Sequence, residues 1–225
     1  MEVFIHPTPE AASESVTSRI AAALEASGDR FTLGLSGGTT PAPVYRALAG
    51  LGLNWGRADL WLSDERWVPH DHQRSNGLMV TDNLVRHVDA RFHRPKWSDR
   101  LEPSDSAADY ETVIRALHRL HRPDIIHLGM GADGHTASLF PRTAALDASS
   151  RWIVANPVPE LGETRITSTF PLLWSARTLV IQATGKTKAE AVRDSLAGKT
   201  PAGRLVEGDA EVEWHLDESA ASLIS

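Results

Sequence analysis

The chain of 225 residues contains no cysteine. A disulfide framework, a cysteine-ligated metal site and a cysteine nucleophile are therefore excluded at the outset. A sequence without cysteine suits a reducing compartment, and we expect the protein to act in the cytoplasm.

The sequence also lacks a long apolar run and an excess of basic residues. No uncharged apolar stretch reaches the roughly 18 residues of a membrane span. The amino-terminal segment has an acid at Glu2 and no basic n-region, which predicts no secretory signal peptide. Lys and Arg number 23 against 29 for Asp and Glu, a net charge of −6, whereas nucleic-acid-binding domains are more often basic. We therefore expect neither a membrane nor a nucleic acid as a partner.

The order of strand-like and helix-like segments predicts an α/β fold. We expect strands at 3–5, 31–35, 60–62, 125–128, 152–155, 178–181 and, at an edge, 211–216, and helices at 9–27 (with Gly28 as C-cap), 42–49, 78–88, 107–120 and 188–196. Such alternation implies a mostly parallel sheet with helices on both faces. No repeat or interdomain linker interrupts it, so residues 1–225 are expected to form a single domain.

Polar or glycine-rich segments follow four of the expected strands, at 36–41, 63–76, 129–136 and 184–188. The carboxyl ends of parallel strands meet at one edge of the sheet, where ligands of α/β proteins bind. The sequence thus predicts that these four segments converge on one site.

The first segment reads Ser36-Gly37-Gly38-Thr39-Thr40 and lies between a strand and a helix. Its glycines expose backbone amides, its hydroxyls add donors, and the helix that follows points its positive end at the loop. This arrangement favours a phosphate site, although a plain strand-to-helix turn has the same pattern.

Three residues in the other segments are candidate cations for an anionic ligand. Arg66, in the triplet Asp64-Glu65-Arg66, has a guanidinium that matches phosphate or carboxylate, with one of the two acids as its support. The alternative is a group of exposed, mutually paired charges. Lys186 and Lys188 open the last helix, where either one neutralises a phosphate or simply faces solvent.

The segment Gly129-Met130-Gly131-Ala132-Asp133-Gly134-His135 matches the G-x-G-x-x-G pattern of dinucleotide sites. The match is incomplete, because Asn156 and not an acid follows the next strand. We therefore expect no nicotinamide cofactor. Histidine is well matched to proton transfer near neutral pH, so His135 is the candidate acid–base residue. Residues two apart need not face each other, so Asp133 either orients the imidazole or only shapes the loop.

Eight of the ten histidines lie between positions 70 and 135, which raises the question of a metal site. The pairs His70/His72 and His118/His121 lack the spacing and the glutamate of a zincin motif, and no third ligand is evident. We expect no metal, and we expect the seven histidines other than His135 on loops and helix surfaces.

Five segments together resemble the 6-phosphogluconolactonase family, which is similar to the glucosamine-6-phosphate deaminases. They are LGLSGGTTPAPVYRAL (33–48), WLSDERWVPHDHQRSN (61–76), IIHLGMGADGHTASLFP (125–141), RITSTFPLLWSARTLVIQATGKTKAEAV (165–192) and EWHLDESAA (213–221). The third is the most specific, because its continuation from Thr136 to Pro141 follows the lactonase pattern and not that of the deaminases.

This resemblance implies a Rossmann-like α/β fold and hydrolysis of 6-phospho-D-glucono-1,5-lactone to 6-phosphogluconate, the second step of the oxidative pentose phosphate pathway, without a cofactor. It implies His135 as the catalytic base, steadied by Asp133. We expect substrate binding by Ser36, Gly37, Gly38, Thr39, Arg66, Gly131, Arg165 and Lys188, and a protein that is a monomer or a weak homo-oligomer.

Two departures from the family pattern affect the expected substrate contacts. Trp174 stands where asparagine is frequent, and Arg74 stands where an acid is common. Neither touches the Asp133–His135 motif.

Two other functions stay open at this stage. A sugar-phosphate isomerase or amino-sugar deaminase shares these loops but needs a carboxylate base at substrate C2. A sugar-phosphate-sensing domain of a transcription regulator would have a helix-turn-helix ahead of it, and the first strand, expected at Val3, leaves no room for one.

Overall fold

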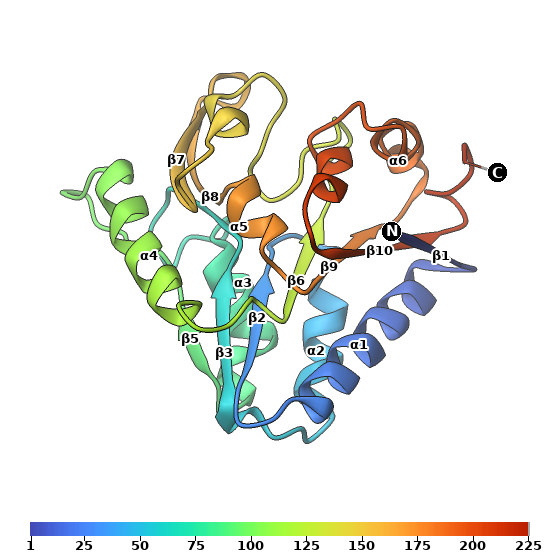
Figure 1. The fold of residues 1–225 in the computed structure, drawn as a ribbon, viewed down its shortest axis with the longest axis horizontal. Coiled ribbons are helices and arrows are strands. Elements are labelled where there is room, and N and C mark those ends of the chain that lie inside the picture. The colour runs from blue at the N-terminus through green and yellow to red at the C-terminus, as the bar shows by residue number, and fades with distance from the viewer. Residues whose placement is uncertain (225) are drawn as a thin grey trace.

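Seven parallel strands form the central sheet of the computed structural model, which describes residues 1–224. Their order is β1-β10-β9-β6-β2-β3-β5, and every neighbouring pair is parallel (Figure 1). The strands are β1 (Glu2–His6), β2 (Phe31–Leu35), β3 (Ala58–Leu62), β5 (Arg91–His93), β6 (Ile125–Gly129), β9 (Thr178–Ala183) and β10 (Glu211–Asp217). The predicted α/β fold with a mostly parallel sheet is confirmed.

Helices cover both faces of this sheet. They are α1 (Pro9–Ala26), α2 (Ala42–Gly50), α3 (Asn76–Asn83), α4 (Pro103–Leu117), α5 (Phe170–Trp174) and α6 (Ala189–Leu196). Short 3₁₀ turns lie at Trp55–Arg57, Val85–His87, Ala144–Asp147, Pro159–Leu161, Lys186–Lys188 and Ala202–Glu207. No helix within residues 1–224 has both the length and the apolar character of a membrane span.

The buried apolar side chains form two clusters, one on each face of the central sheet, because side chains alternate between the faces along each strand. In β3, Leu60 and Leu62 pack with α1, α2 and α3, whereas Trp61 packs with α4 and α5 on the other face. In β9 the alternation is the same, with Val180 on the first face and Leu179 on the second. The strands are therefore apolar on both sides, as buried parallel strands are.

A second, smaller sheet was not expected from the sequence. It is antiparallel, in the order β4-β8-β7, and consists of β4 (Asp64–Arg66), β8 (Glu163–Ser168) and β7 (Ile153–Val158). The segment predicted at 152–155 as part of the parallel sheet lies in this one instead. The turn at Pro159–Leu161 and Gly162, whose φ is +62°, returns the chain directly, and such a short connection pairs strands antiparallel.

Two further predictions about element positions were wrong. Strand β10 is not at an edge, because β1 pairs along its outer side. Gly28 is not the C-cap of α1. The helix ends at Ala26, Ser27 is the cap residue in an extended conformation, and Gly28 is not among the glycines with positive φ. At the other end of α1, Thr8 is the N-cap residue, and its Oγ1 accepts a hydrogen bond from the amide of Ala11 at 3.1 Å.

Two of the seven histidines that were expected on loops and helix surfaces are buried. His127 in β6 is 0% exposed, and its Nε2 lies 3.2 Å from Gln182 Oε1. His118, at the end of α4, is 6% exposed against the edge of the Trp61 ring, and neither of its ring nitrogens has a hydrogen-bond partner among residues 1–224. Burial lowers the pKa of each imidazole to about 4. Both rings therefore pack as neutral groups.

These histidines should make the fold sensitive to acid. A histidine whose pKa is lower in the folded than in the unfolded chain contributes its full stability above pH 6.5 and loses it as the pH falls towards 4. The shift of His118 from 6.5 to about 4 corresponds to about 3 kcal/mol at the acid end. We expect His118→Leu to reduce the loss of unfolding free energy between pH 7 and pH 4.5, measured by urea denaturation. The matched control is His121→Leu, at an exposed position just beyond the same helix. An unchanged pH dependence in His118→Leu would contradict the assignment.

Candidate active site

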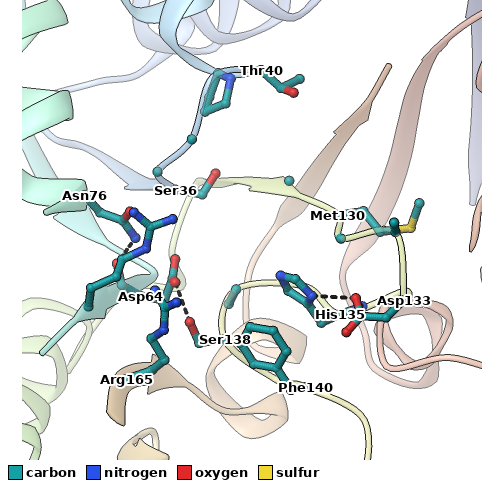
Figure 2. A pocket seen from close by; sticks show the side chains of 18 of the residues that line it. Ser36, Thr40, Asp64, Asn76, Met130, Asp133, His135, Ser138, Phe140 and Arg165 are labelled. Carbon is teal, nitrogen blue, oxygen red and sulfur yellow. Dashed lines mark hydrogen bonds and ion pairs between the residues drawn. The ribbon is translucent and has the colours of Figure 1, made fainter. Parts of the chain in front are cut away.

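One cavity of about 550 Å³ lies where the four polar segments meet, at the carboxyl ends of the central strands (Figure 2). Each segment contributes to its wall, and Leu161 and Arg165 from the smaller sheet and its turn complete it. The structure brings together at this cavity the residues that the sequence singled out for catalysis and substrate binding, Lys186 excepted, namely Ser36, Gly37, Gly38, Thr39, Arg66, Gly131, Asp133, His135, Arg165 and Lys188.

His135 and Asp133 form a hydrogen-bonded pair at this wall. The Asp133 carboxylate lies 2.6 Å from His135 Nδ1 and accepts the backbone amide of His135 at 3.2 Å. Partial burial opposes the charge on Asp133, but the hydrogen bonds and charge of His135 outweigh it and lower the pKa of that carboxyl. With Nδ1–H donating to Asp133, Nε2 is the free acceptor, and Figure 2 shows the ring pointing into the cavity. Nε2 is thus placed to accept a hydrogen bond from a molecule in the cavity.

The glycine-rich loop closes on this histidine from behind. The amide of Gly131 donates to the carbonyl of His135 at 2.8 Å, and Gly134 has a φ of +78°. A Cβ at Gly131 would lie 2.1 Å from His135 Nδ1, so only glycine leaves room for the ring. Phe140 stacks on the imidazole with 4.0 Å between ring centroids. Backbone and aromatic contacts therefore fix the orientation of the base.

Two arginines face each other on the smaller sheet. Arg66 of β4 is directly opposite Arg165 of β8 in the antiparallel register, and both line the cavity. Burial and the charge of Arg66 lower the pKa of Arg165. The Nε atoms of both guanidiniums are buried without a hydrogen-bond partner among residues 1–224. Since like charges directly opposite each other are unfavourable, this pair favours an anion between or beside them.

The sequence predicted that Asp64 or Glu65 would support the Arg66 guanidinium, and this prediction was wrong. That guanidinium donates from Nη1 to the carbonyl oxygen of Arg74 at 2.6 Å, whereas the bond from Arg66 to Glu65 comes from the Arg66 backbone amide and not from its side chain. Asp64 faces the cavity and accepts a hydrogen bond from Ser138 Oγ at 2.6 Å. Ser138 and Phe140 also line the cavity but lie beyond the four polar segments, so the sequence did not single them out.

The loop after β2 is held at its first residue by Tyr45. The Tyr45 hydroxyl donates to the Ser36 carbonyl at 3.0 Å and accepts the Ser36 amide at 3.1 Å. Gly37 lies against Asn76, where a Cβ would be 1.8 Å from the side-chain oxygen, and Gly38 has a φ of +110°. Ser36 Oγ is buried at the cavity without a partner among the described residues. The loop therefore offers polar groups to a ligand.

Of the two candidate lysines, Lys188 lines the cavity, whereas Lys186 is not among its lining residues. Burial lowers the pKa of Lys188, and the negative charge of Asp133 opposes that shift. The two departures from the family pattern lie outside the lining residues. Trp174 Nε1 donates to the carbonyl of Arg204 at 2.9 Å, and the Arg74 side chain pairs with Glu163.

No group of histidine and acidic side chains within residues 1–224 has the geometry of a metal site. The clustering of histidines along the sequence is therefore not a clustering in space around one ion.

Comparisons with known proteins place this chain among sugar-phosphate enzymes. Residues 7–214 match the family model described as glucosamine-6-phosphate isomerases/6-phosphogluconolactonase. A 6-phosphogluconolactonase of Synechocystis is 37% identical over 94% of this chain and 91% of its own length, and one of Nostoc is 34% identical over 87% and 85%.

Solved structures agree with these sequence matches. The 6-phosphogluconolactonase of Leishmania guyanensis has a TM-score of 0.87 at 28% identity, covering 100% of this chain and 98% of its own. A monomeric glucosamine-6-phosphate deaminase has a TM-score of 0.86 at 25% identity, covering 99% and 100%.

The close approach of Gly131 to His135 gives a test of the site geometry. We expect Gly131→Ala to displace the imidazole and to lower the unfolding free energy by about 1–3 kcal/mol, the usual cost of overpacking. Long-range ¹H–¹⁵N NMR of the ring nitrogens should show the Nδ1–H form in the unaltered protein and its loss in the variant. Gly129→Ala is the matched control, because a Cβ there has nothing within 4 Å. Identical ring spectra for the two variants would contradict the packing described.

Proposed function

Because the chain belongs to the glucosamine-6-phosphate isomerase/6-phosphogluconolactonase family, we propose that it hydrolyses 6-phospho-D-glucono-1,5-lactone to 6-phospho-D-gluconate. This makes it a carboxylic ester hydrolase of the oxidative pentose phosphate pathway. The observation that carries the proposal is one cavity holding a carboxylate-oriented histidine together with two opposed arginines. Hydrolysis of a sugar phosphate lactone needs a base that activates water for attack on the carbonyl carbon, and cations that bind the phosphate.

The arginine pair and the loop after β2 would bind the substrate phosphate. Arg66 and Arg165 supply charged N–H groups, and Lys188, directly before α6, adds a third cation. The amides of Gly37, Gly38 and Thr39 with the Ser36 hydroxyl supply further donors ahead of α2. Binding the phosphate in this way fixes the lactone ring relative to His135.

In the chemical step, Nε2 of His135 takes a proton from water as the water oxygen attacks C1 of the lactone. The carbonyl oxygen becomes an oxyanion, which backbone amides of the glycine-rich loops would stabilise. The Gly131 amide is not one of them, because it donates to the His135 carbonyl. Collapse of this intermediate breaks the bond between C1 and the ring oxygen. The imidazolium, stabilised by Asp133, returns its proton to the departing ring oxygen, and the free acid then ionises. Water and these side chains suffice for the whole sequence of steps.

The isomerase or deaminase alternative has one structural observation in its favour. It needs a carboxylate base at C2, and Asp64 places a carboxylate in the cavity wall. That carboxylate already accepts the Ser138 hydroxyl, and the Synechocystis and Nostoc relatives are named as 6-phosphogluconolactonases. A coupled assay with glucosamine 6-phosphate separates the two activities. The sensing-domain alternative predicts sugar-phosphate binding without turnover of either compound.

We also propose that residues 1–225 work as one domain, because the two apolar clusters share the strands of one sheet. We propose the cytoplasm as its location, since phosphorylated sugars are made and used inside cells, and a monomer or weak homo-oligomer as its state.

The role of His135 is tested by His135→Ala in a steady-state lactonase assay. Loss of a general base should lower kcat by about 10²–10⁴-fold. Asp133→Asn should also lower kcat, because an amide no longer selects the Nδ1–H form of the ring. His87→Ala is the control, at an exposed position that does not line the cavity. A near-normal kcat in His135→Ala would remove the histidine from the proposed role.

The role of Arg66 is tested by comparing phosphorylated and unphosphorylated ligands. We expect Arg66→Ala to weaken binding of 6-phosphogluconate by about 10–100-fold, the value of a charge-assisted hydrogen bond, and to leave gluconate binding unchanged. Isothermal titration calorimetry measures both affinities. Arg86→Ala removes an equal charge from an exposed arginine paired with Asp82 on α3 and serves as the control. Equal losses for both ligands would show that Arg66 does not bind the phosphate.

A further inference from the structure

A chain of polar contacts behind the cavity joins the two opposed arginines. Glu163 begins β8, and Arg165 lies two residues further along it, so the two side chains project from the same face of the strand. Glu163 Oε2 lies 2.8 Å from Arg165 Nη2. The other oxygen of Glu163 accepts a hydrogen bond from the Arg74 guanidinium.

Arg74 continues this chain to the second arginine. Its backbone carbonyl accepts the Arg66 Nη1–H at 2.6 Å. Arg74 belongs to the loop between β4 and α3, where its own amide donates to His72 Nδ1 at 3.1 Å. Each guanidinium of the phosphate site is therefore attached to one member of the Arg74–Glu163 pair, and neither member is among the residues that line the cavity.

The opposed arginines need such a support because their charges repel each other. The register places Arg66 and Arg165 directly across from one another, and burial together with Arg66 lowers the pKa of Arg165. The hydrogen bond from Arg74 and the charges of Arg165, Arg74 and Arg66 lower the pKa of Glu163 and so keep it ionised. One carboxylate thus faces three guanidiniums.

We propose that Glu163 is a positioning residue that holds Arg165 directly, and Arg66 through Arg74, in the arrangement that receives the substrate phosphate. This inference rests on the proposed function and deepens it. It also gives a purpose to the arginine at position 74, which departs from the family pattern. In this chain, Arg74 fastens the loop after β4 to the start of β8.

Removal of the Glu163 charge should change the affinity for phosphate ligands, and the direction of that change distinguishes a positioning role from a purely electrostatic one. Glu163→Gln makes the neighbourhood of the cavity more positive, so an effect of charge alone would strengthen phosphate binding. If Glu163 positions the arginines, its loss lets two repelling guanidiniums move apart, and binding weakens. We expect about a tenfold increase in KM for the lactone and in Kd for 6-phosphogluconate, with kcat changed by less than about threefold.

The matched control is Glu160→Gln, because Glu160 lies in the turn just before β8 and pairs with Arg142 at 3.0 Å, outside the cavity lining. It removes the same charge without touching Arg66 or Arg165. Arg74→Ala should weaken phosphate binding in the same direction as Glu163→Gln. The double variant should be no worse than the poorer single variant, because the two residues act in one chain of contacts.

Calorimetric titration with inorganic phosphate and with 6-phosphogluconate keeps this test separate from catalysis. If the protein shows no lactonase activity, the proposed function fails, while the binding measurements still decide the role of Glu163. Binding by Glu163→Gln that is as tight as, or tighter than, that of the unaltered protein overturns the inference, as do additive effects of the two substitutions. Should circular dichroism show that Glu163→Gln is unfolded, Arg74→Ala decides alone, because that side chain is 50% exposed and its backbone carbonyl remains.

Discussion

The buried carboxylate of Glu65 is the interaction on which the geometry of the site depends. It is 4% exposed and accepts the amides of Arg66, Asn76 and Gly77 at 2.7–2.8 Å, with the Ser75 hydroxyl at 3.0 Å. Burial raises the pKa of this carboxyl, and the four donors oppose that shift. One side chain thus joins β4, which holds Arg66 of the proposed phosphate site, to the first turn of α3.

The same contact reaches the loop after β2 through Asn76. The Asn76 side chain donates to the carbonyl of Asp64 at 2.8 Å and lies against Gly37, where no other side chain would fit. Two of the polar segments, 36–41 and 63–76, are therefore joined behind the cavity. This explains how a chain with a net charge of −6 can hold Arg66 and Arg165 opposite each other. The net charge matters less than acids placed behind the cavity, Glu163 among them, and cations left at its wall.

The sequence was sufficient to predict the features that depend on the local pattern of apolar and polar residues. Apolar strands that alternate with helices predicted the parallel sheet, and polar segments at strand ends predicted where the cavity lies. It was not sufficient where distant segments decide the outcome. The pairing of β8 with β4 turns 163–168 into a strand, the pairing of β1 covers β10, and burial inside the sheet accommodates His127 as a neutral ring. Glu65 looked like a solvated charge because its partners follow 10 to 12 residues later.

His135 lies on the loop after a strand of the central sheet, whereas the two arginines lie on the smaller sheet, and Ser138 links the two parts. This residue follows His135 on the loop after β6, and it contacts all three strands of the smaller sheet. Its hydroxyl donates to Asp64 in β4 at 2.6 Å, and its amide donates to Thr167 Oγ1 in β8 at 3.0 Å. Its carbonyl accepts from Asn156 Nδ2 in β7 at 2.9 Å. A mobile base could not use the binding energy of a distant phosphate, because that energy helps catalysis only when the bound geometry is fixed. The contacts of Ser138 hold the loop of His135 against the sheet that contains Arg66 and Arg165, and so fix the distance between the histidine and these cations.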